Sequence, residues 1–193
     1  MLAKLTLRLV AWPEQTWPRF TVAHAESSAQ QRASISEPGT LPSPLGHAAS
    51  AAFVSVLATG IGWALRSGST SGGVVLHMLT ALVGYVGGAT LAVVGSQRLL
   101  GSSGAPPDAI ARYASGAVLP VVLSGVVNVV PFPPLSFVLA LAGAASSAQS
   151  GWIGASAMLA LEGQARRRAA IIPAGLAVSL VLLATFVRMG LPK

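Results

Sequence analysis

The sequence predicts an all-α, polytopic membrane protein with five transmembrane helices and an N-terminal cytosolic amphipathic helical arm. Two observations carry this prediction. Of the 193 residues, 53% are apolar and only 9% are charged, and the charged residues fall into clusters separated by long apolar gaps. An average soluble domain carries roughly 25% charged residues, so a water-exposed surface built from this chain would aggregate. The composition therefore excludes an ordinary soluble enzyme domain and a disordered chain.

Residues 1–45 are predicted to form the cytosolic arm and a linker. The first apolar side chains recur at helical spacing with Lys4 and Arg8 on another face, which suits a helix lying in the membrane interface. Apolar and polar residues alternate strictly over residues 4–9, so a β-strand is an alternative for this segment. A second helix is expected over residues 13–31, because proline is favoured at the first helical position. The Ser/Pro-rich residues 34–44 read as a linker. The spaced apolar residues are Leu2, Leu5, Leu9 and Trp12.

The gaps between charges give the spans, which together form a transmembrane domain over residues 46–193. A helix that crosses about 30 Å of hydrocarbon needs about 20 mostly apolar residues. One gap, residues 113–161, is too long for a single helix and is divided by the three prolines of residues 131–134. Prolines remove backbone donors and disfavour a helix at the preceding residue, so this run predicts a turn. The predicted spans are about 46–65, 74–96, 110–130, 135–160 and 169–187.

The distribution of basic residues predicts the orientation. Cytoplasmic loops carry an excess of Lys and Arg. With the N-terminus inside, the cytoplasmic side would hold nine basic residues and the outside three, and the C-terminus would lie outside. The inner set is Lys4, Arg8, Arg19, Arg32, Arg98, Arg112, Arg166, Arg167 and Arg168, and the outer set is Arg66, Arg188 and Lys193.

Three stretches carry a resemblance to a known family. Residues 13–17 (PEQTW) resemble a P-x-x-T-W opening of an N-terminal helix. Residues 111–120 (ARYASGAVLP) are similar to an A-Y-A/S-x-x-P span opening, and residues 124–131 (SGVVNVVP) resemble A-G-I-L-x-L-I-P. These patterns are typical of the bacterial branch of the YIP domain family, five-span proteins named for binding Ypt/Rab-type GTPases. The resemblance implies a membrane-organising role in the bacterial cytoplasmic (inner) membrane. The acidic-aromatic motif of eukaryotic members is absent at residues 38–42, so a Rab-type partner is not expected.

The sequence does not predict an enzyme. It contains no paired carboxylates, no His-x-x-x-His spacing and no Ser/His/Asp set within the predicted spans, and no metal site is expected. His77 is the one ionisable residue well inside a predicted span. The simple interpretation is a hydrogen-bonded histidine near the outer interface; the alternatives are a ligand to haem or bacteriochlorophyll, or a proton relay. His47, at the start of the first span, is expected on the same side, where the two histidines could be neighbours.

Polar and small residues inside the spans predict helix packing. Asn128 and Gln149, with Ser146, Ser147 and Ser150, are expected to form interhelical hydrogen bonds of about 0.6–2 kcal/mol each. A polar pathway is the alternative, and packing is preferred because no charge accompanies the group. Small residues at four-residue spacing keep one helix face open to close contact, within the bundle or with a separate protein. Those singled out are Gly84, Gly88, Gly143, Ser147 and Gly151.

The remaining expectations concern surface anchors and partners. Trp12 and Trp17, with Arg166, Arg167 and Arg168, are predicted to anchor the protein at the membrane surface. The leading hypothesis is a non-enzymatic scaffold that recruits partners or lipid through its N-terminal arm. An accessory subunit or assembly factor of a respiratory or photosynthetic complex and a small transporter are the alternatives. The expected partners are membrane lipid and other integral membrane proteins, in a homo-oligomer or a hetero-oligomer. Nucleic acid is not expected, because basic residues in the loops of a membrane protein usually lie against anionic lipid.

Overall fold

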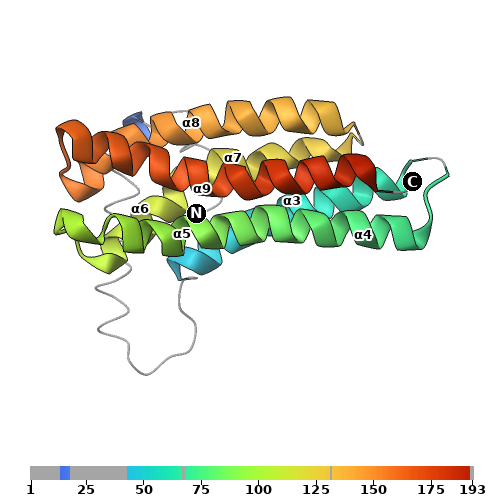
Figure 1. The fold of residues 1–193 in the computed structure, drawn as a ribbon, viewed down its shortest axis with the longest axis horizontal. Coiled ribbons are helices and arrows are strands. Elements are labelled where there is room, and N and C mark those ends of the chain that lie inside the picture. The colour runs from blue at the N-terminus through green and yellow to red at the C-terminus, as the bar shows by residue number, and fades with distance from the viewer. Residues whose placement is uncertain (1–13, 18–42, 67, 131, 192–193) are drawn as a thin grey trace, which may run out of the picture.

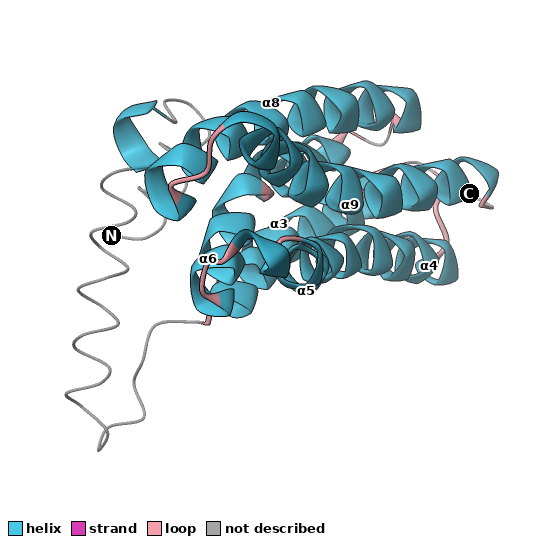
Figure 2. Ribbon diagram, turned by 60° about the vertical axis from the view of Figure 1, so that its left-hand side comes forward, coloured by secondary structure: helices cyan, strands magenta, loops and turns pink. Residues whose placement is uncertain are grey.

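The computed structural model describes residues 14–17, 43–66, 68–130 and 132–191. Over these residues the regular structure is helical, without a strand, and long helices run side by side (Figures 1 and 2). Residues 14–17 form a helical turn. The helices that follow are α3 (Pro44–Ala64), α4 (Ser71–Leu82), a π-helix (Val83–Gly87), α5 (Gly88–Leu99), a short 3-10 helix (Gly101–Ser103), α6 (Pro107–Ala117), α7 (Leu119–Leu123), a second 3-10 helix (Ser124–Val129), α8 (Pro133–Leu159) and α9 (Gly163–Gly190).

Four helical stretches are long and apolar enough to cross a membrane, which agrees with four of the five predicted spans and with an integral membrane protein. They are Pro44–Ala64, Ser71–Leu99, Pro107–Val129 and Gly163–Gly190. The fifth predicted span corresponds to α8, whose 27 residues are also long enough to cross. Its middle carries Ser146, Ser147 and Gln149, which lower its hydropathy and set it apart from the other four. A membrane crossing by α8 therefore stays a prediction.

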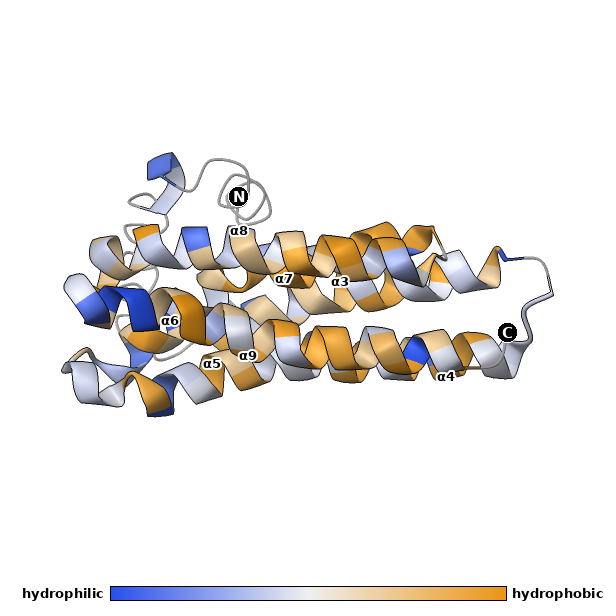
Figure 3. Ribbon diagram, turned by 45° about the horizontal axis from the view of Figure 1, so that its top comes forward, coloured by the Kyte–Doolittle hydropathy of each residue, from blue (hydrophilic) through white to orange (hydrophobic). Residues whose placement is uncertain are grey.

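The two ends of the bundle differ in charge. We call the end that holds Arg98, Arg112 and Arg166 the basic end; α5 and α8 end there, and α6 and α9 begin there. We call the other the proline-turn end, because the second 3-10 helix ends there and α8 begins there with Pro133 and Pro134. Figure 3 shows the hydrophobic colour along the middle of the long helices and the strongest hydrophilic colour at the basic end. This is the distribution expected of helices that pass through hydrocarbon.

The stretch Pro107–Val129 is irregular and lies in the middle of the bundle, with 72% of its apolar window buried against 39–44% for the other three spans. Pro120 follows the end of α6, and the backbone continues as α7 and a 3-10 helix. Neighbouring helices satisfy the backbone groups at this break. Ser147 Oγ accepts a hydrogen bond from Val121 N at 3.1 Å, and Ser55 Oγ donates to the Val122 carbonyl at 2.6 Å. Such compensation is what a membrane interior requires, because water cannot satisfy freed backbone groups there.

Small residues lie where the second span meets α9. A Cβ on Gly84 would come within 2.6 Å of Ala184 Cβ, and one on Gly88 within 2.9 Å of the Ala177 carbonyl oxygen. Real Cβ atoms do not approach other atoms so closely without a shift of the neighbour. The absence of a side chain at both positions therefore sets how close this span and α9 approach.

The small residues of α8 make the same kind of contact. A Cβ on Gly143 would lie 2.9 Å from the Pro120 carbonyl oxygen, and one on Gly151 would lie 3.1 Å from Ala170 Cα. Ser147, the third of the set, makes the hydrogen bond to Val121. The small-residue faces of both spans thus pack inside the bundle, and the structure places none of these five residues on a face open to a separate protein.

The histidines lie at opposite ends of the bundle. His47 is in the first turn of α3 at the basic end, whereas His77 is in the second turn of α4 at the proline-turn end. The possibility that they are neighbours is excluded, because α3 and α4 run antiparallel and each histidine lies near the start of its helix (Figure 1).

Candidate functional site

Five helical segments bring polar side chains to one buried cluster near the proline-turn end, which we call the polar centre. Side chains in this position have no access to bulk water, so each must find its partners within the protein. The polar centre consists of Thr59 of α3, Tyr85 of the π-helix, Asn128 of the second 3-10 helix, Ser136 of α8, and Thr185 and Arg188 of α9.

Asn128 is the hub of the polar centre and is only 2% exposed. Its Nδ2 donates hydrogen bonds to Thr59 Oγ1 at 2.9 Å and to Tyr85 Oη at 3.1 Å, and its Oδ1 accepts one from Ser136 Oγ. Thr59 in turn donates to the carbonyl oxygen of Ser55 at 2.9 Å. One amide therefore links α3, the π-helix and α8 through the 3-10 helix that carries it.

Arg188 brings a positive charge to the polar centre, and its side chain is only 3% exposed. Its Nη2 donates to Thr185 Oγ1 at 3.1 Å, its Nη1 lies 3.4 Å from Thr59 Oγ1, and its guanidinium lies beside the Tyr85 hydroxyl. The buried Nε has no acceptor among the residues that the structure describes. Asp108 and Glu162, two carboxylates of the described chain, lie at the basic end.

Among the residues that the structure describes, no carboxylate lies beside this buried guanidinium, which is unusual. Removing an ion from water costs several kcal/mol unless its charge is compensated. Ionisable residues inside membrane-spanning bundles are rare and mark ligand or ion sites. The polar centre is therefore the strongest candidate for a binding site in the core of this bundle, and an anion is the ligand that its charge suits.

Sequence reasoning found Asn128 but missed the rest of the polar centre. The predicted last span ends at residue 187, which places Arg188 outside, whereas α9 continues to Gly190 and turns Arg188 inward. The premise that no charge accompanies Asn128 is therefore wrong. Gln149, grouped with Asn128 by sequence, is exposed on α8. The signal that could have found the centre is the recurrence of Thr, Tyr and Asn in otherwise apolar spans.

His77 is fully buried against Trp63. The two rings stack with centroids 3.6 Å apart and an interplanar angle of 8°, and the Arg66 guanidinium carbon lies 4.7 Å from the centroid of the Trp63 ring. A haem or bacteriochlorophyll must reach a ring nitrogen of its ligand, and the His77 side chain offers no exposed surface. The residues in this conformation do not fit a tetrapyrrole.

Trp17 packs in the bundle and not on the membrane surface. Its side chain is 0% exposed, its Nε1 donates to Ser150 Oγ at 3.2 Å, and its ring stacks on Tyr113 with centroids 6.0 Å apart. Gly154 leaves the space, since a Cβ there would lie 2.6 Å from the indole. The prediction of Trp17 as a surface anchor is wrong for this reason. Trp12 and the predicted helix of residues 1–12 lie outside the described residues.

Tyr113 ties the same region together. Its hydroxyl lies 3.0 Å from the Gly151 carbonyl oxygen and 2.7 Å from that of Ala169, so its proton is shared between α8 and α9. Trp17 rests on the ring of this tyrosine. The helical turn of residues 14–17 is consequently seated on α6 and α8 in the half of the bundle nearer the basic end.

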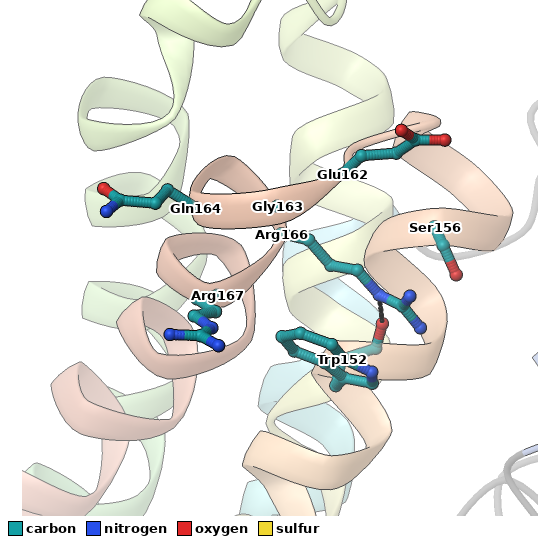
Figure 4. Close-up of a pocket in the computed structure, with 7 residues that line it drawn as sticks. All are labelled: Trp152, Ser156, Glu162, Gly163, Gln164, Arg166 and Arg167. Carbon is teal, nitrogen blue, oxygen red and sulfur yellow. Dashed lines mark hydrogen bonds between the residues drawn. The ribbon is translucent and has the colours of Figure 1, made fainter.

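A pocket of about 600 Å³ opens at the turn from α8 to α9 (Figure 4). Arg166 Nε donates to the Trp152 carbonyl oxygen at 2.8 Å, and the guanidinium carbon lies 4.3 Å from the centroid of the Trp152 ring. Arg167 and Arg168 are exposed on the first turns of α9. The pocket is lined by Trp152, Ser156, Glu162, Gly163, Gln164, Arg166 and Arg167.

The geometry of the polar centre and of the pocket stands without support from relatives, because comparison with family models, with curated proteins and with solved structures finds no match for this chain.

Proposed function

We propose that this protein is a non-enzymatic integral-membrane scaffold of the type that the YIP resemblance implies, with its basic end in the cytosol. The N-terminal arm would recruit partners or lipid, because an amphipathic helix can bury its apolar face at a membrane surface. The observation that carries the proposal is the seat of Trp17. Its indole lies in the bundle between Tyr113 and Gly154, so the chain on either side of residue 17 starts from a fixed point on the membrane domain.

Trp17 lies in the half of the bundle nearer the basic end, which is the end that we propose to be cytosolic. Trp17 binds Ser150 of α8, in the half of the bundle nearer the basic end, and α3 begins at that end with Pro44. Residues 18–42 link these two points of the membrane domain in the sequence. Fixing both ends of a segment lowers the entropic cost that the segment pays when it binds a partner.

The experiment compares partner capture by three forms of the chain in a gentle detergent, read by quantitative mass spectrometry. The forms are the full chain, a chain without residues 1–12, and a chain in which a Gly/Ser linker of equal length replaces residues 19–42. All three forms keep Trp17 and its packing against Tyr113 and Gly154. Equal melting temperatures would show that the membrane domain is equally stable in the three forms. Partners lost with either segment support the scaffold. Partners retained by all three forms would place the interaction on the spans and favour an accessory subunit of a larger complex.

Arg188 favours a second candidate, a small transporter for an anionic solute. No charged residue lies in the middle of a predicted span, but the structure places the Arg188 guanidinium in the polar centre beside Tyr85, which is hydrogen-bonded to Asn128. We expect flux of small carboxylates or inorganic anions into proteoliposomes, with loss in Arg188→Gln and no loss in Arg66→Gln, a control arginine stacked on Trp63 near the same end. Equal flux through protein-free vesicles would remove this candidate.

A further inference from the structure

We propose that the pocket at the α8–α9 turn binds the headgroup of an ethanolamine phospholipid, with Arg166 on the phosphate and Glu162 on the primary ammonium. The inference needs only that α9 crosses a membrane, and it is independent of the N-terminal arm. The argument rests on the depth of the pocket, the fixed orientation of Arg166 and the mixed charge of the lining.

The pocket lies at the depth of lipid headgroups. With 28 residues, α9 is about 42 Å long and exceeds the roughly 30 Å of the hydrocarbon core. The stretch without charged residues begins after Arg168, so the first turn of α9 extends beyond the hydrocarbon. The Trp152 indole is 38% exposed beside it, a position typical of the aromatic side chains that line the membrane interface.

Arg166 is held ready to bind an anion. Its Nε is used by the Trp152 carbonyl oxygen at 2.8 Å, and the ring of the same residue supports the guanidinium from one face at 4.3 Å. The donors on Nη1 and Nη2 remain for a ligand, and their planar fork matches two oxygens of a phosphate. Because the side chain is already ordered, less rotamer entropy is lost when a phosphate binds.

The carboxylate in the lining selects the kind of phospholipid. Figure 4 shows Glu162 and Ser156 on the same side of the turn as the Arg166 guanidinium, with Gln164 and Arg167 extending from the other side of α9. A headgroup with only negative charge would leave Glu162 without a hydrogen-bond donor. An ethanolamine headgroup brings a phosphate and a primary ammonium, and the ammonium can donate hydrogen bonds to a carboxylate.

The other common headgroups fit less well. The trimethylammonium of choline has no N–H to donate to Glu162, and Arg166 already occupies one face of the Trp152 ring. Glycerol carries no positive charge for the carboxylate. A pocket of about 600 Å³ has room for a whole headgroup and the ester-linked start of its acyl chains.

The experiment measures lipid retention by the delipidated full-length protein in native mass spectrometry, with thermal unfolding in detergent as a second readout. Equimolar phosphatidylethanolamine, phosphatidylglycerol and phosphatidylcholine are offered in turn, with inorganic phosphate and O-phosphoethanolamine as soluble probes. We expect phosphatidylethanolamine to be retained most. Arg166→Gln should lower its retention by about tenfold, as expected for losing a charge-assisted contact. Arg168→Gln, which removes an exposed neighbouring charge outside the pocket lining, should leave retention within about twofold.

Glu162→Gln gives an independent test, because Glu162 is exposed and its replacement does not disturb the core. This variant should lose the preference for phosphatidylethanolamine over phosphatidylglycerol while still retaining phospholipid. Equal retention of the three lipids by the unmodified protein would overturn the proposal, as would equal losses in Arg166→Gln and Arg168→Gln. Stabilisation by inorganic phosphate equal to that by the lipid would show a phosphate site and also overturn it.

Discussion

The hydroxyl of Thr59 accepts a hydrogen bond from the side-chain amide of Asn128 at 2.9 Å, across 69 positions of the chain. Thr59 Oγ1 also donates to the Ser55 carbonyl and lies 3.4 Å from Arg188 Nη1. Its single proton and both lone pairs are thus engaged, which is the full capacity of a hydroxyl. The contact joins α3 to the central irregular span and to the last turn of α9.

Replacing Asn128 with leucine should destabilise the bundle by about 1–3 kcal/mol, because the Thr59, Tyr85 and Ser136 hydroxyls would lose a partner in a buried place. The measurement is thermal unfolding in detergent. Gln149→Leu is the matched control, since Gln149 is exposed on α8. Equal melting temperatures for the two variants would show that the amide contributes nothing to stability.

Arg188→Met is expected to raise the melting temperature or leave it unchanged, since methionine fills a similar volume without a buried charge. Arg188→Glu should lower it, because a carboxylate would lie beside hydroxyls now acting as acceptors and without a cation. The same unfolding assay gives the sign. A clear loss of stability in Arg188→Met would mean that the hydrogen bonds to Thr185 and Thr59 outweigh the cost of burying the guanidinium.

Gly88→Ala should cost about 1–3 kcal/mol, because its Cβ would lie 2.9 Å from the Ala177 carbonyl oxygen and push the second span away from α9. Gly175→Ala is the control within α9, where a Cβ meets nothing within 4 Å. The control should be neutral or gain up to about 1 kcal/mol from the higher helix propensity of alanine. Thermal unfolding of the two variants shows whether close helix approach or helix propensity determines the effect of replacing these glycines.

Trp17→Ala should cost about 3–5 kcal/mol through the cavity left beside Tyr113 and Gly154. Trp17→Phe should cost less than Trp17→Ala, since an aromatic ring is kept, although its smaller ring leaves some space and cannot donate to Ser150. Deleting residues 1–31 should be as harmful as Trp17→Ala, whereas deleting residues 1–12 should not. If the chain without residues 1–31 has the same melting temperature as the full chain, the helical turn at residues 14–17 is dispensable for the fold.

Single cysteines at Ser71 and Ser102 should respond oppositely to an impermeant thiol reagent in intact cells. Both residues are exposed, at opposite ends of the bundle, and the chain has no natural cysteine. The excess of arginines at the basic end predicts labelling of Ser71→Cys only. Labelling of Ser102→Cys only would reverse the proposed orientation.

Much of the bundle follows from the positions of charged residues in the sequence. Arg66 and Arg98 enclose the second span and the proline run separates α8 from the span before it, so the predicted ends of these two segments agree with the helices within three residues. This works because a charge in hydrocarbon is costly and usually marks the end of a span. The same rule fails for Arg188, which belongs to the last turn of a helix yet points into the protein.

The candidate site could be predicted only in part, for reasons that lie in tertiary contacts. Asn128 was visible as an amide among valines, but its partners come from segments far away in sequence. The enrichment of tryptophan at membrane interfaces predicts an interfacial Trp17, whereas the space beside Gly154 and the hydroxyl of Ser150 accommodate its indole inside the bundle. Neither feature has a signature local to residues 14–17.

The π-helix at Val83–Gly87 makes the second span sensitive to its exact number of residues. A π-turn holds one residue more than an α-turn, so it shifts the direction of every side chain that follows by about 100° relative to an uninterrupted helix. Tyr85 reaches Asn128 from within this turn, while Gly88 and Ala92 are buried just beyond it. Removing one residue there would straighten the helix and leave its composition and hydropathy almost unchanged. Such a deletion would turn one half of the span against the other, so that Tyr85 and Gly88 could no longer both face their present neighbours.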